Sequence, residues 1–182
     1  DPARYYLDDS SGKAWAPDGA IVYVRRTERH FVTRNGFEMD LPGGKYTLVA
    51  ERGPEYRPFR ITVDGQGQKD VTLNVSLSRW INMNRRGWYS GDLHNHRKPD
   101  EMALLLLPDD LNLAPTHSDW IWDDRQLSAP PQTTDAIRKF NPTHPYRFLD
   151  KEVERLKVGP GAVDLLGLKS PIQFEGYALY PP

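Results

Sequence analysis

A turn followed directly by a strand is predicted by the stretch Leu41-Pro42-Gly43-Gly44-Lys45-Tyr46-Thr47-Leu48-Val49-Ala50. Proline and glycine are preferred in tight turns, and the run after them is rich in residues that suit a pleated strand. Short runs of this kind, broken by turn residues, continue across residues 14–77. None of them sustains the apolar spacing of three and four that marks an amphipathic helix. The first part of the chain is therefore predicted to form a β-sandwich.

Two other patterns in this region predict particular strands. Asn35-Gly36 is a hairpin signal, and it would join a strand at residues 31–33 to one at residues 37–39. Residues 71–77 alternate strictly between apolar and polar side chains. Because successive side chains of a strand point to opposite faces, this alternation predicts a strand with one buried face.

The composition excludes several classes of protein. The 24 Lys and Arg are balanced by 25 Asp and Glu, whereas a nucleic-acid-binding surface needs a clustered basic excess. The chain has no cysteine, so any metal must be held by histidine or carboxylate side chains. The longest apolar run, residues 102–107, is far shorter than the roughly 20 residues of a membrane-spanning helix. We therefore expect no nucleic-acid partner and no membrane span.

Candidate metal ligands cluster after residue 90, in Gly91-Asp92-Leu93-His94-Asn95-His96. Two histidines at positions i and i+2 of a strand point to the same face, so their imidazoles can converge on one cation. An isolated pair of this kind is also common among surface or hydrogen-bonding histidines. Here two carboxylates follow, Asp100 and Glu101, and either could complete a metal site with His94 and His96.

The next segment predicts a helix and then a second strand. Pro99 suits the first turn of a helix, and residues 102–107 supply its buried body. Residues 111–116 then predict a short strand that ends at His117. In an α/β barrel, ligands gather at the carboxyl ends of the strands, where His94, His96 and His117 would all lie.

The first part of the chain resembles the carboxypeptidase regulatory-like, transthyretin-like sandwich modules. The resemblance rests on Pro17-Asp18-Gly19 and on the stretch at residues 41–48. Such modules act as spacers or docking platforms attached to extracellular enzymes. The resemblance therefore implies support rather than chemistry for this part of the chain.

The segment at residues 91–96 resembles the first motif of the PHP (polymerase and histidinol phosphatase) metal-dependent hydrolases, especially their carbaryl-hydrolase-like branch. In that branch sandwich modules can precede the catalytic domain. Residues 111–119 are similar to the second motif, although Thr116 precedes the histidine where the family commonly has Asp. The resemblance implies that His94 and His96 are metal ligands, that Glu101 or Asp100 is an acidic partner, and that His117 is a ligand or substrate contact.

A third, looser match lies near the end of the sequence. Glu152-Val153-Glu154 and residues 159–168 are similar to a family pattern in which a strand with a metal-bridging Glu precedes a strand with Gly-His. The resemblance implies that Glu152 or Glu154 bridges the metals, and the sequence leaves open which one. Ala162 stands where the family's histidine is expected, so one ligand or proton-transfer group is replaced.

Together these patterns predict a β-sandwich at residues 1–80, followed at residues 81–182 by the N-terminal part of an α/β PHP-type barrel. The expected cofactors are divalent ions such as Zn, Mn or Fe, which would activate water against a phosphoester, ester, amide or carbamate. His117, Glu152 and Glu154 are the expected catalytic residues. The module resemblance and the absence of cysteine also favour an extracellular or periplasmic location.

Two accounts of the chain remain open at the level of sequence. The residues from 87 onward amount to about half of the roughly 200 that an α/β barrel requires. Either the chain is the N-terminal part of a longer secreted metallohydrolase, whose C-terminal segment covers the partial barrel, or it is a non-catalytic structural or interaction protein. In the second account its exposed strand edges would self-associate, and the histidine pair would be a relic or a structural metal site.

Overall fold

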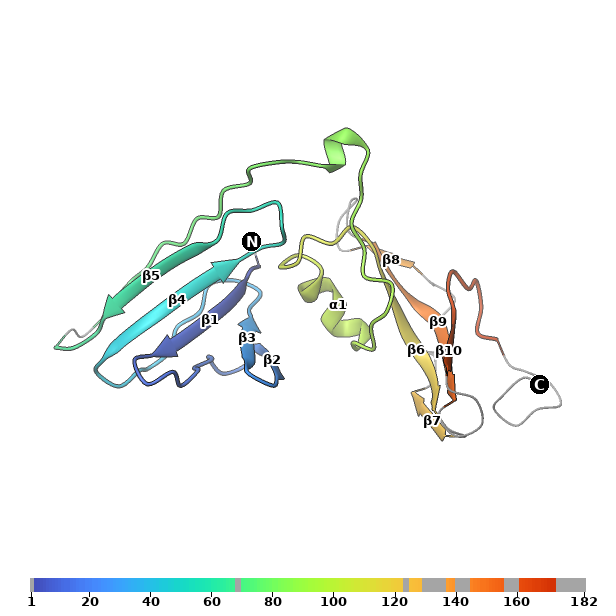
Figure 1. The fold of residues 1–182 in the computed structure, drawn as a ribbon, viewed down its shortest axis with the longest axis horizontal. Coiled ribbons are helices and arrows are strands. Elements are labelled where there is room, and N and C mark those ends of the chain that lie inside the picture. The colour runs from blue at the N-terminus through green and yellow to red at the C-terminus, as the bar shows by residue number, and fades with distance from the viewer. Residues whose placement is uncertain are drawn as a thin grey trace. The chain divides into compact units, whose positions relative to one another are not determined.

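The computed structural model describes residues 2–67, 70–122, 125–128, 137–139, 145–155 and 161–172 (Figure 1). The chain is mostly β-sheet and divides into two units, each with one five-stranded sheet. The first unit comprises Asp1–Tyr89 and Leu107–Asp110, and the second comprises Ser90–Leu106 and Leu111–Pro182. The sequence predicted a boundary between residues 80 and 81. In the structure the first unit extends to Tyr89 and also includes Leu107–Asp110.

The sheet of the first unit is antiparallel, with the strand order β2-β3-β1-β4-β5. Its strands are β1 (Arg4–Asp9), β2 (Ile21–Arg25), β3 (Glu28–Val32), β4 (Lys45–Glu51) and β5 (Phe59–Asp64). The predicted turn and strand at residues 41–50 correspond to β4 and the residues before it. The hydroxyl of Tyr46 donates a hydrogen bond to the carbonyl oxygen of Pro42 at 2.6 Å, which fastens this turn to the strand.

The core of the first unit lies on one face of this sheet. Alternate residues of β4, Tyr46, Leu48 and Ala50, are buried, and they lie opposite Asp9, Leu7 and Tyr5 of β1. Burying a side chain of this size stabilises the fold by roughly 1.5–3 kcal/mol. The face is covered by partly buried apolar side chains from segments outside the sheet; they include Trp15, Phe37, Met39, Leu41, Val75 and Leu77.

The hairpin predicted at Asn35-Gly36 is wrong. The hairpin of this region joins β2 to β3 through Arg26 and Thr27, and Arg26 adopts a left-handed conformation with φ 55°. Residues 37–39 form no strand. Phe37 instead packs its ring edge-on against Tyr5, with the ring centroids 5.2 Å apart. Its burial on the core face takes the place of pairing at a sheet edge.

The strand predicted at residues 71–77 is also wrong, because the structure assigns no strand there. The alternation of side chains nevertheless has a physical meaning at one end of the segment. Val75 and Leu77 pack against the core, whereas Val71 and Leu73 are 44% and 37% exposed. The apolar alternation therefore corresponds to core contacts at only one end of the segment, and it does not require that the backbone pairs with a neighbour.

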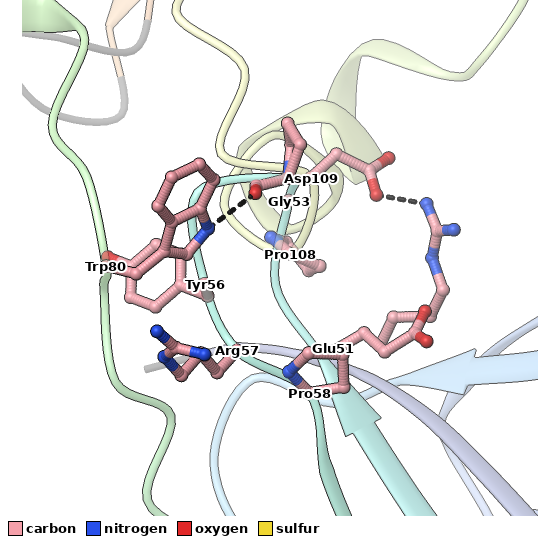
Figure 2. A pocket seen from close by; sticks show the side chains of 10 residues that line it. Glu51, Gly53, Tyr56, Arg57, Pro58, Trp80, Pro108 and Asp109 are labelled. Carbon is pink, nitrogen blue, oxygen red and sulfur yellow. Dashed lines mark hydrogen bonds and ion pairs between the residues drawn. The ribbon is translucent and has the colours of Figure 1, made fainter.

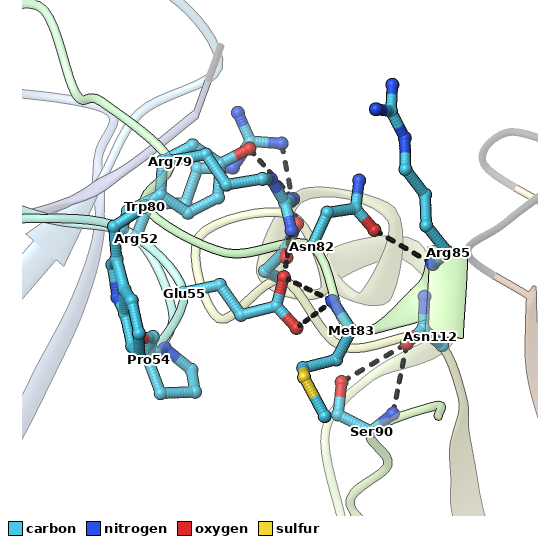
Figure 3. A network of polar contacts seen from close by, with 12 residues as sticks. Arg52, Pro54, Glu55, Arg79, Trp80, Asn82, Met83, Arg85, Ser90 and Asn112 are labelled. Carbon is cyan, nitrogen blue, oxygen red and sulfur yellow. Dashed lines mark hydrogen bonds and ion pairs between the residues drawn. The ribbon is translucent and has the colours of Figure 1, made fainter. Parts of the chain in front are cut away.

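A polar network in the first unit surrounds Arg79 (Figure 3). The guanidinium donates hydrogen bonds to Asp110 Oδ2 at 2.7 Å and to Tyr56 Oη at 2.9 Å, and it also donates to the carboxylate of Glu55. Glu55 accepts a further hydrogen bond from the backbone N–H of Met83. Both carboxylates are largely withdrawn from solvent, and Asp110 also pairs with Arg52 at 3.9 Å, so losing the Arg79 guanidinium would leave the buried charge of Glu55 without its ion pair.

The sheet of the second unit has the order β10-β9-β6-β7, and β8 pairs with β9. Its strands are β6 (Ala114–Trp122), β7 (Arg125–Ser128), β8 (Ile137–Lys139), β9 (Pro145–Arg155) and β10 (Gly161–Leu165). β6 and β9 are parallel, and the other pairs are antiparallel. The parallel pair forms the centre of the sheet.

The helix predicted from Pro99 is confirmed as α1 (Pro99–Leu105), with the proline in its first turn. Met102 and Leu106 pack against Ala114 at the start of β6 and form a small core. The other helical element in the described residues is a 3₁₀ turn, η1 (Asn84–Arg86). Within these same residues, no helix combines the length and apolarity needed to cross a bilayer.

Candidate metal centre

Three side chains in the second unit place potential ligand atoms within 4.8 Å of one another: His94, His96 and Glu152. Glu152 Oε2 lies 2.8 Å from His96 Nε2 and 3.2 Å from His94 Nε2. The two Nε2 atoms are 3.3 Å apart. Two imidazoles and a carboxylate form a donor set that suits Zn, Mn or Fe, so this cluster could hold a metal ion.

The histidine segment is positioned by backbone pairing alongside β6. Gly91 and Leu113 form a parallel bridge, and the backbone N–H of Asp92 donates to the carbonyl oxygen of Leu113 at 3.1 Å. Further along, the backbone N–H of His117 donates to the carbonyl oxygen of Asn95 at 3.0 Å. The backbone of Asn95 is therefore paired with β6. His94 and His96 lie two residues apart on this extended segment, so their side chains point to the same face and enter the cluster.

Glu152 comes from the central strand β9 and has a side chain only 2% exposed. In the parallel pair it lies opposite Trp120 of β6. A buried carboxylate is costly unless a partner compensates its charge. The Nε2 atoms of both histidines lie within hydrogen-bonding distance of this carboxylate, and a metal ion would compensate its charge directly.

The electrostatic environment keeps His96 in its metal-binding form. Burial lowers the pKa of His96, the carboxylate of Glu152 opposes this shift, and neighbouring His117 and His94 lower the pKa further. With a pKa below the usual 6.5, the imidazole of His96 is neutral at pH 7. Neutral imidazole is the form that coordinates metals, because protonation removes the free lone pair.

His117 lies beside the cluster and is fully buried, with ring centroids 5.1 Å from His94 and 5.5 Å from His96. Its Nδ1 is 3.4 Å from the carbonyl oxygen of Asn95, which can only accept, so Nδ1 carries the proton. Its Nε2 lies 3.3 Å from Asp164 Oδ1 but is not aligned for a hydrogen bond. A neutral ring would thus direct a lone pair towards a carboxylate, an arrangement that a shared cation stabilises.

The other expected site residues lie outside the three-residue cluster. Glu101 is on α1, and its carboxylate is not among the grouped ligand atoms of the described residues. Asp100 is on the same helix, and its side chain lies outside the described part of the structure. Glu154 shares a strand face with Glu152, but it pairs in register with Ala162 and does not join the group. Of the two carboxylates left open by sequence, the structure brings Glu152 to the histidines.

Two neighbours of the cluster had no assigned role in the sequence. Asp164 of β10 lies opposite Glu152 in the sheet register and approaches His117. Trp120 of β6 places its ring centroid 4.2 Å from that of His96. A signal for Asp164 existed in the sequence, because it lies two residues after Ala162 and so shares its strand face.

Buried polar contacts hold the strands that carry the cluster. Lys151 Nζ donates to Asp119 Oδ2 at 3.0 Å, and both side chains are about as buried as the apolar core. Asp150 Oδ1 accepts a hydrogen bond from the backbone N–H of Gly167 at 2.8 Å. The first contact joins β9 to β6, and the second joins β9 to the segment after β10. A buried ion that loses its partner destabilises strongly, so the Lys151–Asp119 pair helps to hold β6 beside β9.

No protein-family model, curated protein or solved structure matches this chain.

Proposed function

We propose that the second unit binds a divalent metal ion through His94, His96 and Glu152, and that it uses this ion to hydrolyse a phosphoester, ester, amide or carbamate. The observation that carries the proposal is the convergence of these three side chains from two separate segments of the chain. The orphaned Nε2 of buried His117, facing Asp164, supports the presence of a cation in the same region.

The donor set suits Zn, Mn or Fe, and such an ion would lower the pKa of a coordinated water from about 15.7 towards about 7. Glu152 supplies the negative charge that holds a cation, from a buried position that solvent does not screen. His94 is 56% exposed and His96 is 31% exposed, so the histidine side of the cluster is open to an incoming substrate. Where no cation lies between them, His117 Nε2 can accept a proton next to the carboxylate of Asp164.

The arrangement around the cluster supports our proposal that the second unit is the N-terminal part of an α/β barrel of PHP type. The segment of His94 and His96, β6 and β9 all run parallel, and α1 lies between the first two in sequence, as in a strand-helix-strand unit. The antiparallel strands β7, β8 and β10 depart from such a barrel. For the first unit we propose a sandwich-like supporting module, because its apolar sheet face is covered and its residues form no metal-ligand group within the described part.

A non-catalytic assembly protein is the second candidate, and the composition of β10 favours it. This strand borders β9 and exposes apolar Val163 to 60%, and the residue after it, Leu166, is 44% exposed. Exposed apolar side chains at a sheet edge favour association with another chain. In this account the metal would stabilise the fold rather than activate water. Both candidates are consistent with a secreted protein.

Metal content and hydrolysis tested together distinguish the two candidates. After dialysis against Zn²⁺, Mn²⁺ or Fe²⁺, the intact chain is expected to retain metal by mass spectrometry, whereas the His94→Ala and His96→Ala variants lose it. The chain is then assayed with the p-nitrophenyl esters of phosphate and acetate, a p-nitroanilide and a p-nitrophenyl carbamate. His30→Ala, in the other unit, serves as the matched control and should keep both properties.

Hydrolysis that disappears with the bound metal in both variants supports the enzyme. Retained metal without hydrolysis of any of these substrates, together with sedimentation as an oligomer, supports the assembly protein. Equal metal binding by the intact chain and both variants would defeat the site itself.

A further inference from the structure

A hollow of about 810 Å³ opens in the first unit, and none of its lining residues belongs to the metal-binding cluster (Figure 2). Its volume falls within the range of roughly 300–1,000 Å³ that is typical of small-molecule sites. Figure 2 shows Trp80 and Tyr56 on one side of the hollow, with Glu51 and Asp109 towards the other. The hollow therefore combines an aromatic wall with a charged rim.

Trp80 is an exposed side chain that is nevertheless held in a fixed position. It is 57% exposed, yet its indole Nε1–H donates to the carbonyl oxygen of Pro54 at 3.0 Å. Its backbone N–H donates to the carbonyl oxygen of Glu55, also at 3.0 Å. Since the one polar atom of the indole is already bonded, Trp80 offers a ligand only its ring face, and it does so without losing conformational freedom on binding.

Tyr56, which supports this wall, is also fixed in place. The guanidinium groups of Arg52 and Arg79 lie 4.9 Å and 4.4 Å from its ring centroid, and its hydroxyl accepts a hydrogen bond from Arg79. These contacts restrain the tyrosine from the side of the polar network. The aromatic wall is thus built before any ligand arrives.

The charged groups of the hollow balance one another. Arg4 and Asp109 form an ion pair, and the remaining charges are those of Arg57 and Glu51. Among the described residues, the side chains of Arg57 and Glu51 have no hydrogen-bonding partner. The hollow therefore presents one strong donor and one strong acceptor with no net charge, which matches a neutral ligand rather than an anionic or cationic one.

Hydroxyl groups fit this pair because each can both donate and accept a hydrogen bond. A pyranose ring also has a face of C–H groups, which packs favourably on the electron-rich face of an indole. An extended proline-rich peptide is the other ligand that aromatic walls bind. Arg57 could donate to its carbonyl groups, but proline has no backbone N–H, so such a peptide would offer few donors to the carboxylate of Glu51.

We propose that this hollow binds a neutral carbohydrate, whose ring stacks on Trp80 while its hydroxyl groups bond to Arg57 and Glu51. The first unit would then attach the chain to a polysaccharide. This role is independent of the metal site in the second unit and would hold even if no hydrolysis takes place there.

Electrophoresis of the intact chain in native gels tests this proposal. The gels contain xylan, mixed-linkage β-glucan, galactomannan, soluble starch or hydroxyethylcellulose, and retardation by at least one of them is expected. Trp80→Ala should abolish the retardation. Because that variant also removes the bond to Pro54, Arg57→Ala and Glu51→Gln are tested as well, and each should weaken binding about tenfold.

Trp88→Ala is the matched control, because Trp88 is 69% exposed and does not line the hollow. This variant should be retarded like the unchanged chain. The proposal is overturned if none of the five polysaccharides retards the chain, or if Trp88→Ala weakens binding as much as Trp80→Ala does. Retention of a poly-L-proline peptide in place of the polysaccharides would also overturn it, because it would assign a peptide site to the hollow.

Discussion

Glu152 is the residue on which the candidate metal centre depends most. It is the one carboxylate of the cluster, and it is buried against two histidines that are open to solvent. Its negative charge attracts a cation that His94 and His96 alone would hold weakly. The role of the cluster can therefore be tested by removing this charge while keeping the shape of the side chain.

We expect Glu152→Gln to weaken Zn²⁺ binding by more than about 100-fold, since even residues that only orient metal ligands change affinity by about 10–100-fold. Isothermal titration calorimetry measures the change. Glu154→Gln is the matched control, because Glu154 lies on the same strand face outside the cluster, and its affinity should stay within about threefold. Equal losses in the two variants would show that the strand face acts through its overall charge.

We expect the stability of the first unit to depend on pH because of His30. Burial lowers the pKa of His30, nearby Arg4 lowers it further, and the carboxylate of Glu28 opposes the shift. The folded chain therefore binds a proton here less readily than the unfolded chain, whose histidine pKa is about 6.5. The contribution of neutral His30 to stability is present above pH 6.5 and is lost as the pH falls through the lowered pKa.

Urea unfolding of the unchanged chain and of His30→Phe, at pH 7.5 and at pH 5.5, measures this contribution. Phenylalanine keeps a ring to stack on Tyr23, which lies 4.9 Å from the His30 ring, but it does not titrate. The variant should lose less stability between the two pH values than the unchanged chain does. Identical losses would mean that His30 is not the group that responds.

At the scale of elements, Gly53 marks a close approach between the end of β4 and the segment Leu107–Asp110 within the first unit. Its backbone is left-handed with φ +48°, and a Cβ there would lie 2.7 Å from the carbonyl oxygen of Asp109. Its N–H donates to the carbonyl oxygen of Pro108 at 2.9 Å. A side chain at this position would have to displace backbone, which cannot give way easily.

Gly53→Ala should therefore lower the free energy of unfolding by at least about 2 kcal/mol. Gly12→Ala is the matched control, since Gly12 also has a positive φ, of +84°, but has open space where the Cβ would lie. That variant should cost about 1 kcal/mol, from backbone conformation alone. Chemical denaturation followed by circular dichroism gives both values, and equal costs would remove the close approach as a cause.

The elements that sequence predicts well are those with local signals. The turn before β4 and the first turn of α1 both depend on residues that lie within the element. The hairpin at Asn35-Gly36 was predicted on equally local grounds and is wrong, because the rings of Tyr5 and Phe31 offer Phe37 a buried surface. That competition depends on distant parts of the chain and cannot be read from the turn itself.

The candidate site also has one part that sequence could predict and one part that it could not. The spacing of His94 and His96 is local, so sequence alone could indicate that they share a face. The choice of Glu152 over Glu154, and the approach of Asp164 to His117, depend on the register among β6, β9 and β10. Register follows from burial along whole strands, and no motif in this chain encodes it.

At the scale of the whole molecule, the two units carry different kinds of candidate site. The first holds an aromatic hollow with balanced charges, and the second holds a cluster of histidines around a buried carboxylate. Each set of residues lies within its own unit. A chain of this design would pair attachment to a polysaccharide in one unit with metal-dependent chemistry in the other.

X-ray absorption at the zinc edge of the Zn²⁺-loaded intact chain tests the central claim, metal coordination by this cluster, most directly. We predict a first shell of nitrogen and oxygen atoms at about 2.0–2.1 Å, with the outer-shell scattering of at least two imidazoles. His94→Ala should lose the signal of one imidazole or fail to bind zinc. A zinc-loaded chain without imidazole scattering, or with the same scattering in the His94→Ala variant, would contradict the account.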